Sequence, residues 1–496
     1  MEEVKSDSTP NGSGTQKAPS LSWRLFRSRY FVLSTIAAVI VASISLTFVH
    51  FLTGDSSFER DARSSISKFI RGLASLDVDD YRTPTASQQI FLLEEASVFF
   101  TDKLVYGQTE QLTLYYSSPE VPSAALFGRS ENELDLFGTV IDIPLGESDF
   151  SRPLVVDSIS GFDLDKFASQ QVSLEGLAPG WHQIHIQLDT AEKHLPFFIE
   201  PEELKSRVVF VESTNTFKSY VSDVGLRSNY VNPSNLSGAF TRPMAYPANY
   251  EIVNYLGKQA QTVNCSDHLI NADMVLKQRL DDHGLKFDVV SDEWLEDSRN
   301  LENVDLVILG THNEYWSSEK FNIMTDYLNN GGNMMVLGGN TAFRFIETVD
   351  VDFDLFWGSG VLRTERLDFV NSFLGSYFDS RDYGTWSHFK LSNTLPEFLD
   401  NVALSEEFGR GSDFSDCAAE YGASGHETDK LLQSSSGFEV IGSGQNFLGG
   451  ADIVYSKLDS GGQILNFGSV SLWHGMGDPT ISEIVRQYLL EIGSIQ

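Results

Sequence analysis

A short apolar run with polar residues directly behind it places the strongest constraint on how this chain can fold. Val304–Leu309 is almost wholly apolar, contains β-branched residues and ends at Gly310. This pattern is typical of a strand buried on both faces of a parallel sheet. His312 and Glu314 follow two residues apart, and Ser317 then has the pattern of a helix cap. Because ligands bind beyond the carboxyl ends of such strands, the sequence predicts a functional site here.

Strands and helices alternate around this run from about residue 204 to the C-terminus. Strands are predicted at Val208–Val211, Lys286–Val290, Asn333–Leu337 and Gln463–Phe467, and helices at Asp273–His283, Ser318–Leu328 and Thr480–Leu490. The alternation predicts a doubly wound α/β domain over residues 204–496. Between about residues 345 and 450 the sequence is polar and aromatic without clear periodicity, so no element is predicted there.

The longest apolar run lies near the N-terminus, over residues 30–54. Phe31 to Thr53 is a run of 23 residues with no charge apart from that of His50 when protonated, and a spanning helix needs roughly 20 residues. Arginines precede the run and acidic residues follow it, which places the N-terminus in the cytoplasm. We therefore expect a disordered cytoplasmic tail over residues 1–29 and a single-pass transmembrane helix over 30–54. The rest of the chain would lie on the periplasmic, extracytoplasmic side of the membrane.

Two further segments separate the apolar run from the α/β domain. Residues 55–95 have apolar residues at helical spacing and are predicted to be a helical connector. Residues 96–203 contain short alternating runs separated by Gly, Pro, Ser and Asp turns, a pattern that favours a β-sandwich. That segment holds no obvious cluster of ionisable groups, so a structural or partner-binding role is expected.

Composition excludes several classes of function. The formal net charge of −34 argues against a nucleic-acid partner, because phosphate binding needs a basic face. The two cysteines, Cys265 and Cys417, are too few for a zinc-binding or disulfide framework, and whether they pair stays open. The chain also lacks a nucleophile elbow, a phosphate-binding loop and an H-E-x-x-H zinc motif.

Polar residues that follow predicted strands or stand in loops are candidates for catalysis. His312 can act as an acid, a base or a hydrogen-bond donor, and Glu314 as a base or metal ligand. Alternatively, both side chains only form hydrogen bonds with backbone groups of the loop. Asn340 either orients a substrate carbonyl or is a turn asparagine with left-handed backbone. The segment Tyr421–Asp429 contains Glu427 and suits a general base or a cation contact. Alternatively, it is a polar loop whose side chains only cap its own backbone.

Several tyrosines follow the first predicted strand of the α/β domain, among them Tyr220, Tyr230, Tyr246 and Tyr250. Loop aromatics usually cover the edge of a core. A phenolate is also a hard anionic ligand, and tyrosine holds ferric iron in some haem enzymes. With a carboxylate beside them, tyrosines would favour a hard Lewis-acidic metal. Both interpretations remain open from the residues alone.

Taken together, these segments resemble the catalytic large subunit of N,N-dimethylformamidase. The resemblance is carried, in order, by T-N-T-F-K-S-Y (214–220), R-P (242–243), G-T-H-N-E-Y-W-S (310–317), L-G-G-N (337–340), G-A-S-G-H-E-T-D (422–429), G-A-D-I-V-Y (450–455) and F-G-S (467–469). It covers about residues 95–494. The resemblance implies a β-sandwich followed by an α/β domain of the flavodoxin or glutamine-amidotransferase type.

The resemblance also implies a metal. In that family a mononuclear ferric iron, held by two tyrosines and one glutamate, serves the hydrolysis of a formamide C–N bond. By resemblance, Glu314 is the carboxylate ligand and Tyr220 is one tyrosine ligand. The second tyrosine is Tyr246, with Tyr230 in reserve.

The remaining roles follow from the same resemblance. His312 and Asn340 match residues that orient substrate and water, and Glu427 matches the general base. We therefore expect a membrane-anchored hydrolase of a small polar, amide-like substrate. The alternatives are a hydrolase of another bond and a non-catalytic surface binding module on the same fold. A homo-oligomer or a small partner subunit is compatible with either.

Overall fold

The structure is a computed structural model that describes residues 90–93, 97–130, 137–148, 154–157, 161–162, 165, 167–220, 250–252, 267–349, 352–356, 369–410 and 421–495. The chain divides into two compact units, Met1–Asp80 and Tyr81–Gln496, and every described residue belongs to the second. The predicted tail over 1–29, the predicted transmembrane helix over 30–54 and both cysteines lie outside the described residues. Within the described ranges, no helix has the length and apolar character to cross a membrane.

Strand β1 (Ile90–Leu93) lies where the helical connector was expected to end. It pairs antiparallel with β7 (Leu154–Asp157), which pairs in turn with β8 (Gly161–Phe162). The predicted helix over residues 55–95 is therefore wrong for residues 90–93, and the rest of that segment lies outside the described residues. A run of four apolar residues fits a strand as well as a helix. Here the run is a strand because it pairs with β7.

Two sheets with a shared core follow in the next hundred residues. One contains β2 (Val98–Thr101), β4 (Gln111–Ser117) and β9 (Ala168–Ser173); the other contains, in spatial order, β3 (Val105–Gly107), β11 (Glu192–Glu200), β10 (Gly180–Gln187), β5 (Ser123–Gly128) and β6 (Thr139–Ile143). Alternate residues of β4, such as Leu112 and Leu114, join Ile184 and Ile186 of β10 in one buried apolar cluster. The two sheets therefore face each other as in a β-sandwich.

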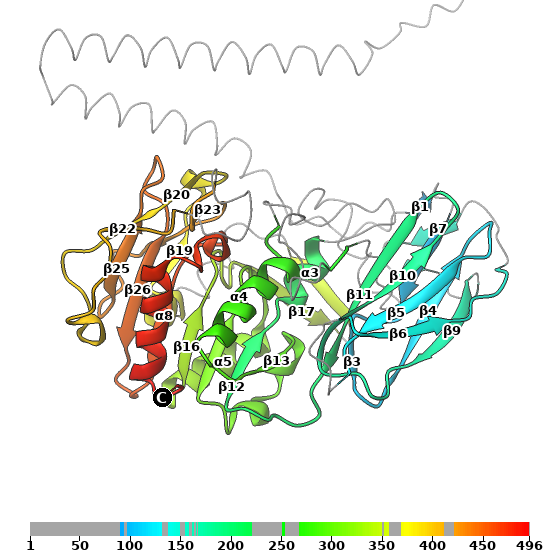
Figure 1. Cartoon of the computed structure of the whole chain (residues 1–496), viewed down its shortest axis with the longest axis horizontal. Coiled ribbons are helices and arrows are strands. Elements are labelled where there is room, and N and C mark those ends of the chain that lie inside the picture. Colours follow the sequence, from blue (N-terminus) through cyan, green and yellow to red (C-terminus); the bar gives the residue numbers. More distant parts are fainter. Residues whose placement is uncertain are drawn as a thin grey trace, which may run out of the picture. The chain divides into compact units, whose positions relative to one another are not determined.

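The largest sheet has nine strands (Figure 1). In order across the sheet they are β13 (Asp288–Val290), β12 (Val208–Val211), β14 (Leu306–Leu309), β16 (Asn333–Val336), β27 (Gln463–Asn466), β26 (Asp452–Lys457), β25 (Glu439–Gly444), β21 (Phe389–Leu391) and β22 (Glu407–Phe408). The first five are parallel and, numbered along the chain, run 2-1-3-4-5, which is the flavodoxin-like order. The last four extend the sheet in antiparallel fashion, so the doubly wound prediction covers only part of it.

Helices cover both faces of the parallel strands (Figure 1). They are α4 (Ile270–Asp282), α5 (Ser318–Asn329) and α8 (Pro479–Glu491). Val208 and Phe210 of β12 pack with α4 and α8, whereas Val209 and Val211 pack with α5. Because successive side chains of a strand point to opposite faces, a strand between two helical layers must be apolar throughout, as β12 is.

The sequence predicted these parallel strands and their helices to within a few residues. The predicted cap is confirmed, since the Ser317 hydroxyl accepts a hydrogen bond from Lys320 N at 3.1 Å. Residues 214–220, which read as a loop, form the short helix α3 (Thr214–Tyr220).

The structure also assigns elements where the sequence predicted none. The remaining strands are β15 (Tyr315–Ser317), β17 (Arg344–Val349), β18 (Asp352–Phe356), β19 (Ser376–Phe378), β20 (Trp386–Ser387), β23 (Ser424–Gly425) and β24 (Asp429–Leu431). Short 3₁₀ or π turns lie at Glu293–Glu296, Ser298–Leu301, Val370–Leu374, Ser380–Asp382, Glu397–Leu399 and Leu472–Gly475. Apart from β17 and β18, these strands have only two or three residues and are too short to leave a periodic signal in the sequence.

Candidate functional site

His312 and Glu314 lie in the loop that follows β14, at the carboxyl edge of the parallel strands. Both residues are buried, with 1% and 2% of their surfaces exposed. His312 Nε2 lies 3.4 Å from Oε2 of Glu314 and 3.0 Å from Oε2 of Glu427. The imidazole therefore stands between two carboxylates, one from its own loop and one from a distant segment.

Glu427 reaches this place because the loop between β23 and β24 is held against the end of β27. The Glu427 carbonyl accepts a hydrogen bond from Val470 N at 3.2 Å, and Asp429 N donates to the Gly468 carbonyl at 2.7 Å. A Cβ atom at Gly339 would lie only 2.8 Å from the Glu427 carbonyl oxygen. Glycine at position 339 therefore allows the loop after β16 to approach the Glu427 segment.

Asn340 links the two loops through both its backbone and its side chain. Its backbone has a φ of 55°, so the left-handed turn expected as one alternative is present. Asn340 N donates to Oδ1 of Asp429 at 2.8 Å, and Nδ2 donates to Oε2 of Glu427 at 2.7 Å. Asn340 Oδ1 is buried and has no hydrogen-bond partner among the described residues. A buried acceptor in that state points to a ligand or a water.

Helix α3 supports the Glu314 loop. The Thr216 hydroxyl accepts hydrogen bonds from Glu314 N at 3.0 Å and from Tyr315 N at 3.4 Å. Position 220, at the end of α3, is one helical turn beyond Thr216. The Tyr220 side chain lies outside the described part of the structure, as do Tyr230 and Tyr246 entirely.

A buried polar network holds the same loop from its other side. Asn313 Oδ1 accepts hydrogen bonds from Lys320 Nζ and from Trp316 Nε1, both at 2.6 Å. Lys320, fully buried on α5, also forms an ion pair with Asp292. Burial lowers the pKa of Lys320, and the Asp292 carboxylate opposes this shift. The network fixes the residue next to Glu314, so the loop has little freedom to move.

Burial also sets the charge state of the site. It lowers the pKa of His312, while the neighbouring Glu314 opposes the shift. It raises the pKa of Asp429 to about 8, with Asn340 N acting in the opposite direction. His312 is therefore neutral and Asp429 predominantly protonated at neutral pH, which limits the charge confined in the site.

Two further histidines, His268 and His426, lie near His312. The His268 ring centroid lies 5.1 Å from that of His312 and 5.2 Å from that of His426. Burial and then His268 lower the pKa of His426 to about 4, and Trp386 stacks on its ring at 5.9 Å. His426 belongs to the polar segment noted in the sequence, whereas nothing in the sequence around His268 marks it.

The structure thus brings together His312, Glu314, Asn340 and Glu427 from segments that are far apart in the chain. Of the expected metal ligands, it describes only the Glu314 side chain. A buried carboxylate is a hard oxygen donor, which fits a ferric ion.

The fold and this cluster define an α/β protein with a buried histidine–carboxylate site at the carboxyl edge of its parallel strands. Residues 170–367 match the family model described as N,N-dimethylformamidase beta subunit-like, C-terminal. The resemblance inferred from the sequence is confirmed over that segment, which contains His312, Glu314 and Asn340 and ends before Glu427. The match supports a hydrolase-type function. No curated protein matches the chain.

Two solved structures show weaker likeness. The mmIFT52 N-terminal domain is 18% identical, with 44% of this chain and 90% of that chain covered and a TM-score of 0.28. A ThuA-like protein from Bacteroides uniformis is 16% identical, with 48% of this chain and 94% of that chain covered and a TM-score of 0.30. Both TM-scores are low, so neither likeness bears on the function of this chain.

Proposed function

We propose that this chain hydrolyses the C–N bond of a small polar amide. The observation that carries the proposal is the position of His312 Nε2, 3.4 Å from the Glu314 carboxylate and 3.0 Å from that of Glu427. A neutral imidazole between two buried carboxylates suits a reaction that moves protons between water and a leaving amine. The family match over residues 170–367 supports a hydrolase, and the amide bond is the finer part of the proposal.

The proposed cofactor is a single ferric ion. Glu314 would hold it together with Tyr220 and Tyr246, with Tyr230 as the alternative second tyrosine. When bound, such an ion supplies Lewis-acid polarisation of a carbonyl and lowers the pKa of water. The contact between Thr216 of α3 and the Glu314 backbone supports this ligand set, because α3 carries position 220.

Glu427 is the proposed general base. It takes a proton from the water whose oxygen bonds to the amide carbon, and it delivers that proton to the nitrogen as the C–N bond breaks. The products are a carboxylic acid and an amine. Asn340 Nδ2 fixes the Glu427 carboxylate at 2.7 Å. Asn340 Oδ1 is then available to accept a hydrogen bond from the water or from a substrate N–H group.

His312 and its neighbours would orient the reactants. With its pKa lowered by burial, His312 is neutral and offers one N–H donor to a carboxylate or to the substrate. His268 and His426 add further imidazole groups beside His312.

The proposal is tested by assaying release of the carboxylic acid product by the iron-loaded full chain. Formamide, N-methylformamide, N,N-dimethylformamide, acetamide and a matched formate ester serve as the substrate series. The expected result is turnover of at least one amide at a rate exceeding that of the ester. Hydrolysis of the ester alone would assign the site to another bond, and tight binding of amides without any turnover would favour the binding module.

The proposed location is tested separately. If residues 30–54 anchor the chain with the N-terminus in the cytoplasm, protease added to spheroplasts with an intact cytoplasmic membrane will digest the segment after residue 54. Protection of that segment until the membrane is permeabilised would contradict this orientation.

A further inference from the structure

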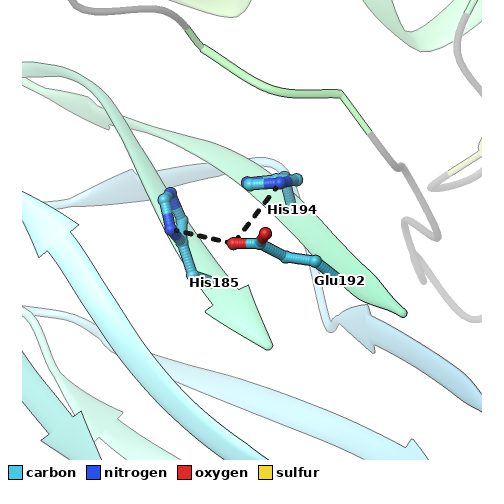
Figure 2. A group of neighbouring side chains, drawn as sticks. All are labelled: His185, Glu192 and His194. Atoms are coloured by element: carbon cyan, nitrogen blue, oxygen red, sulfur yellow. Dashed lines mark ion pairs between the residues drawn. The ribbon is translucent and has the colours of Figure 1, made fainter. Parts of the chain in front are cut away.

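A second cluster of potential metal ligands lies in the β-sandwich, apart from the histidine–carboxylate site. It consists of His185 on β10 and of Glu192 and His194 on β11 (Figure 2). Glu192 Oε1 lies 3.7 Å from Nδ1 of His185 and 3.7 Å from Nε2 of His194. In Figure 2 both rings flank the carboxylate, and each is joined to it by a dashed line.

The strand pairing explains why these side chains meet. His185 and His194 are direct partners in the antiparallel ladder of β10 and β11, so their side chains share one face of the sheet. Glu192 precedes His194 by two residues and therefore falls on the same face. The turn between the strands is closed by a hydrogen bond from Leu188 N to the Ala191 carbonyl at 2.9 Å. The cluster is thus built on a regular hairpin.

The two carboxylate–imidazole separations suit a tetrahedral ion, and the three ligand atoms all lie within 4.8 Å of one another. Ligand atoms bound at 2.0–2.2 Å to a tetrahedral zinc ion lie roughly 3.3–3.6 Å apart, close to the observed 3.7 Å. Two imidazole nitrogens and one carboxylate oxygen are a donor set typical of zinc and similar divalent ions. The side chain of Glu192 is 48% exposed, which leaves room for a water as the fourth ligand.

A neighbouring aromatic ring restrains one of the two histidines. Phe127 stacks on His185 with the ring centroids 4.1 Å apart, which restrains the imidazole. A neutral imidazole has the free lone pair that a metal needs.

We propose that His185, Glu192 and His194 bind one zinc ion, or a divalent ion of similar chemistry, on the β-sandwich. This site is independent of the proposed hydrolysis and of the iron ligands. The ion cross-links β10 to β11 beside the hairpin turn, and its effect is to stabilise the sandwich.

Calorimetric titration of the purified full chain with zinc chloride, after chelation of bound metal, tests the proposal. We expect one equivalent of zinc to bind with micromolar affinity or tighter. His185→Gln and His194→Gln should each weaken this binding at least tenfold. Glu192→Gln keeps the size of a half-exposed side chain and should also weaken binding, so the result does not depend on variants that disturb folding.

His388→Gln is a matched control. His388 Nε2 also lies 3.7 Å from a glutamate, Glu407, but the described structure gives this pair no second histidine. Its loss should leave zinc affinity unchanged. If His388→Gln weakened binding as much as His185→Gln, zinc would be binding surface histidines in general and the proposal would be wrong.

Glu314→Gln separates this site from the proposed iron site, where zinc could also enter. The proposal requires that the tight zinc equivalent persist in Glu314→Gln and that zinc raise the Tm of this variant as it does that of the wild type. Zinc binding that disappears in Glu314→Gln and survives in His185→Gln would overturn the assignment. So would a wild-type chain that binds no zinc at micromolar concentration.

Discussion

Nε2 of His312 lies 3.0 Å from Oε2 of Glu427, although the two residues belong to separate loops of the α/β fold. The loop of His312 follows β14. The loop of Glu427 precedes β24 and is hydrogen-bonded to the segment at the end of β27. The distance between these atoms therefore depends on the order of strands in the sheet.

Glu427→Gln should abolish most amide hydrolysis without loss of iron. Glutamine still accepts the hydrogen bond from Asn340 Nδ2 but cannot take a proton from water. Loss of a general base typically costs about 10²–10⁴-fold in turnover. Steady-state kinetics and metal analysis measure the two effects, with exposed Glu406→Gln as the control. Unchanged turnover in Glu427→Gln would remove it from the mechanism.

Glu314→Gln should lose iron and activity together. A neutral amide is a poorer ligand for a hard cation than a buried carboxylate. The variant should therefore lose the visible charge-transfer colour that tyrosinate gives when it binds ferric iron. Metal analysis and absorption spectra of the loaded chain provide the measurement. Full iron content in Glu314→Gln would show that Glu314 is not a ligand.

Asn340→Ala and Asn340→Gly separate the backbone role of this residue from its side-chain role. Both variants remove the hydrogen bond to Glu427, so turnover should fall roughly 10-fold to 100-fold in each. Only alanine is strained at a φ of 55°, so Asn340→Ala should be less stable than Asn340→Gly by about 1 kcal/mol. Urea unfolding and kinetics measure both effects. Asn401→Gly, at an exposed left-handed asparagine, should leave turnover unchanged.

Glu200→Gln should change how stability depends on pH. Burial raises the pKa of Glu200, at the end of β11, to about 7, while a hydrogen bond from Ser291 opposes the shift. The folded chain therefore holds this proton more tightly than the unfolded chain. The resulting stabilisation is full below about pH 4.5 and is lost as the pH rises through about 7.

Relative to wild type, Glu200→Gln should therefore gain stability between those pH values, by about 3 kcal/mol in total. Urea unfolding across this range measures the gain. Ser291→Ala removes an interaction that lowers the Glu200 pKa, so it should move the loss of stability to higher pH. A stability difference between Glu200→Gln and wild type that does not vary with pH would contradict the raised pKa.

Lys320→Met should destabilise the fold by about 3–5 kcal/mol, because it leaves the buried Asp292 carboxylate without its cation. It also removes the hydrogen bond from Lys320 to Asn313, so the Glu314 loop should loosen and turnover should fall. Adding Asp292→Asn should recover part of the stability. If the double variant is no more stable than Lys320→Met, the buried charge is not the cause.

The sequence by itself determined the local elements that position the site. Val304–Leu309 is apolar at every position but one, and its observed strand, β14, is buried throughout. The serine cap at Ser317 was likewise predictable, because the hydroxyl and the Lys320 N–H that it accepts from are three residues apart. Such features depend on neighbours within one or two helical turns, which a single sequence displays directly.

Only the tertiary structure decided the geometry of the site and the presence of His268 in it. His268 lies beside His312 although nothing in the sequence marks it. The resemblance grouped Glu427 with His312, but the contact between them depends on strand order and on a loop packed at Gly339. The same is true of the His185–Glu192–His194 cluster, which depends on the register of β10 against β11. Contacts between distant segments are specified by the packing of the whole domain, so local sequence patterns do not encode them.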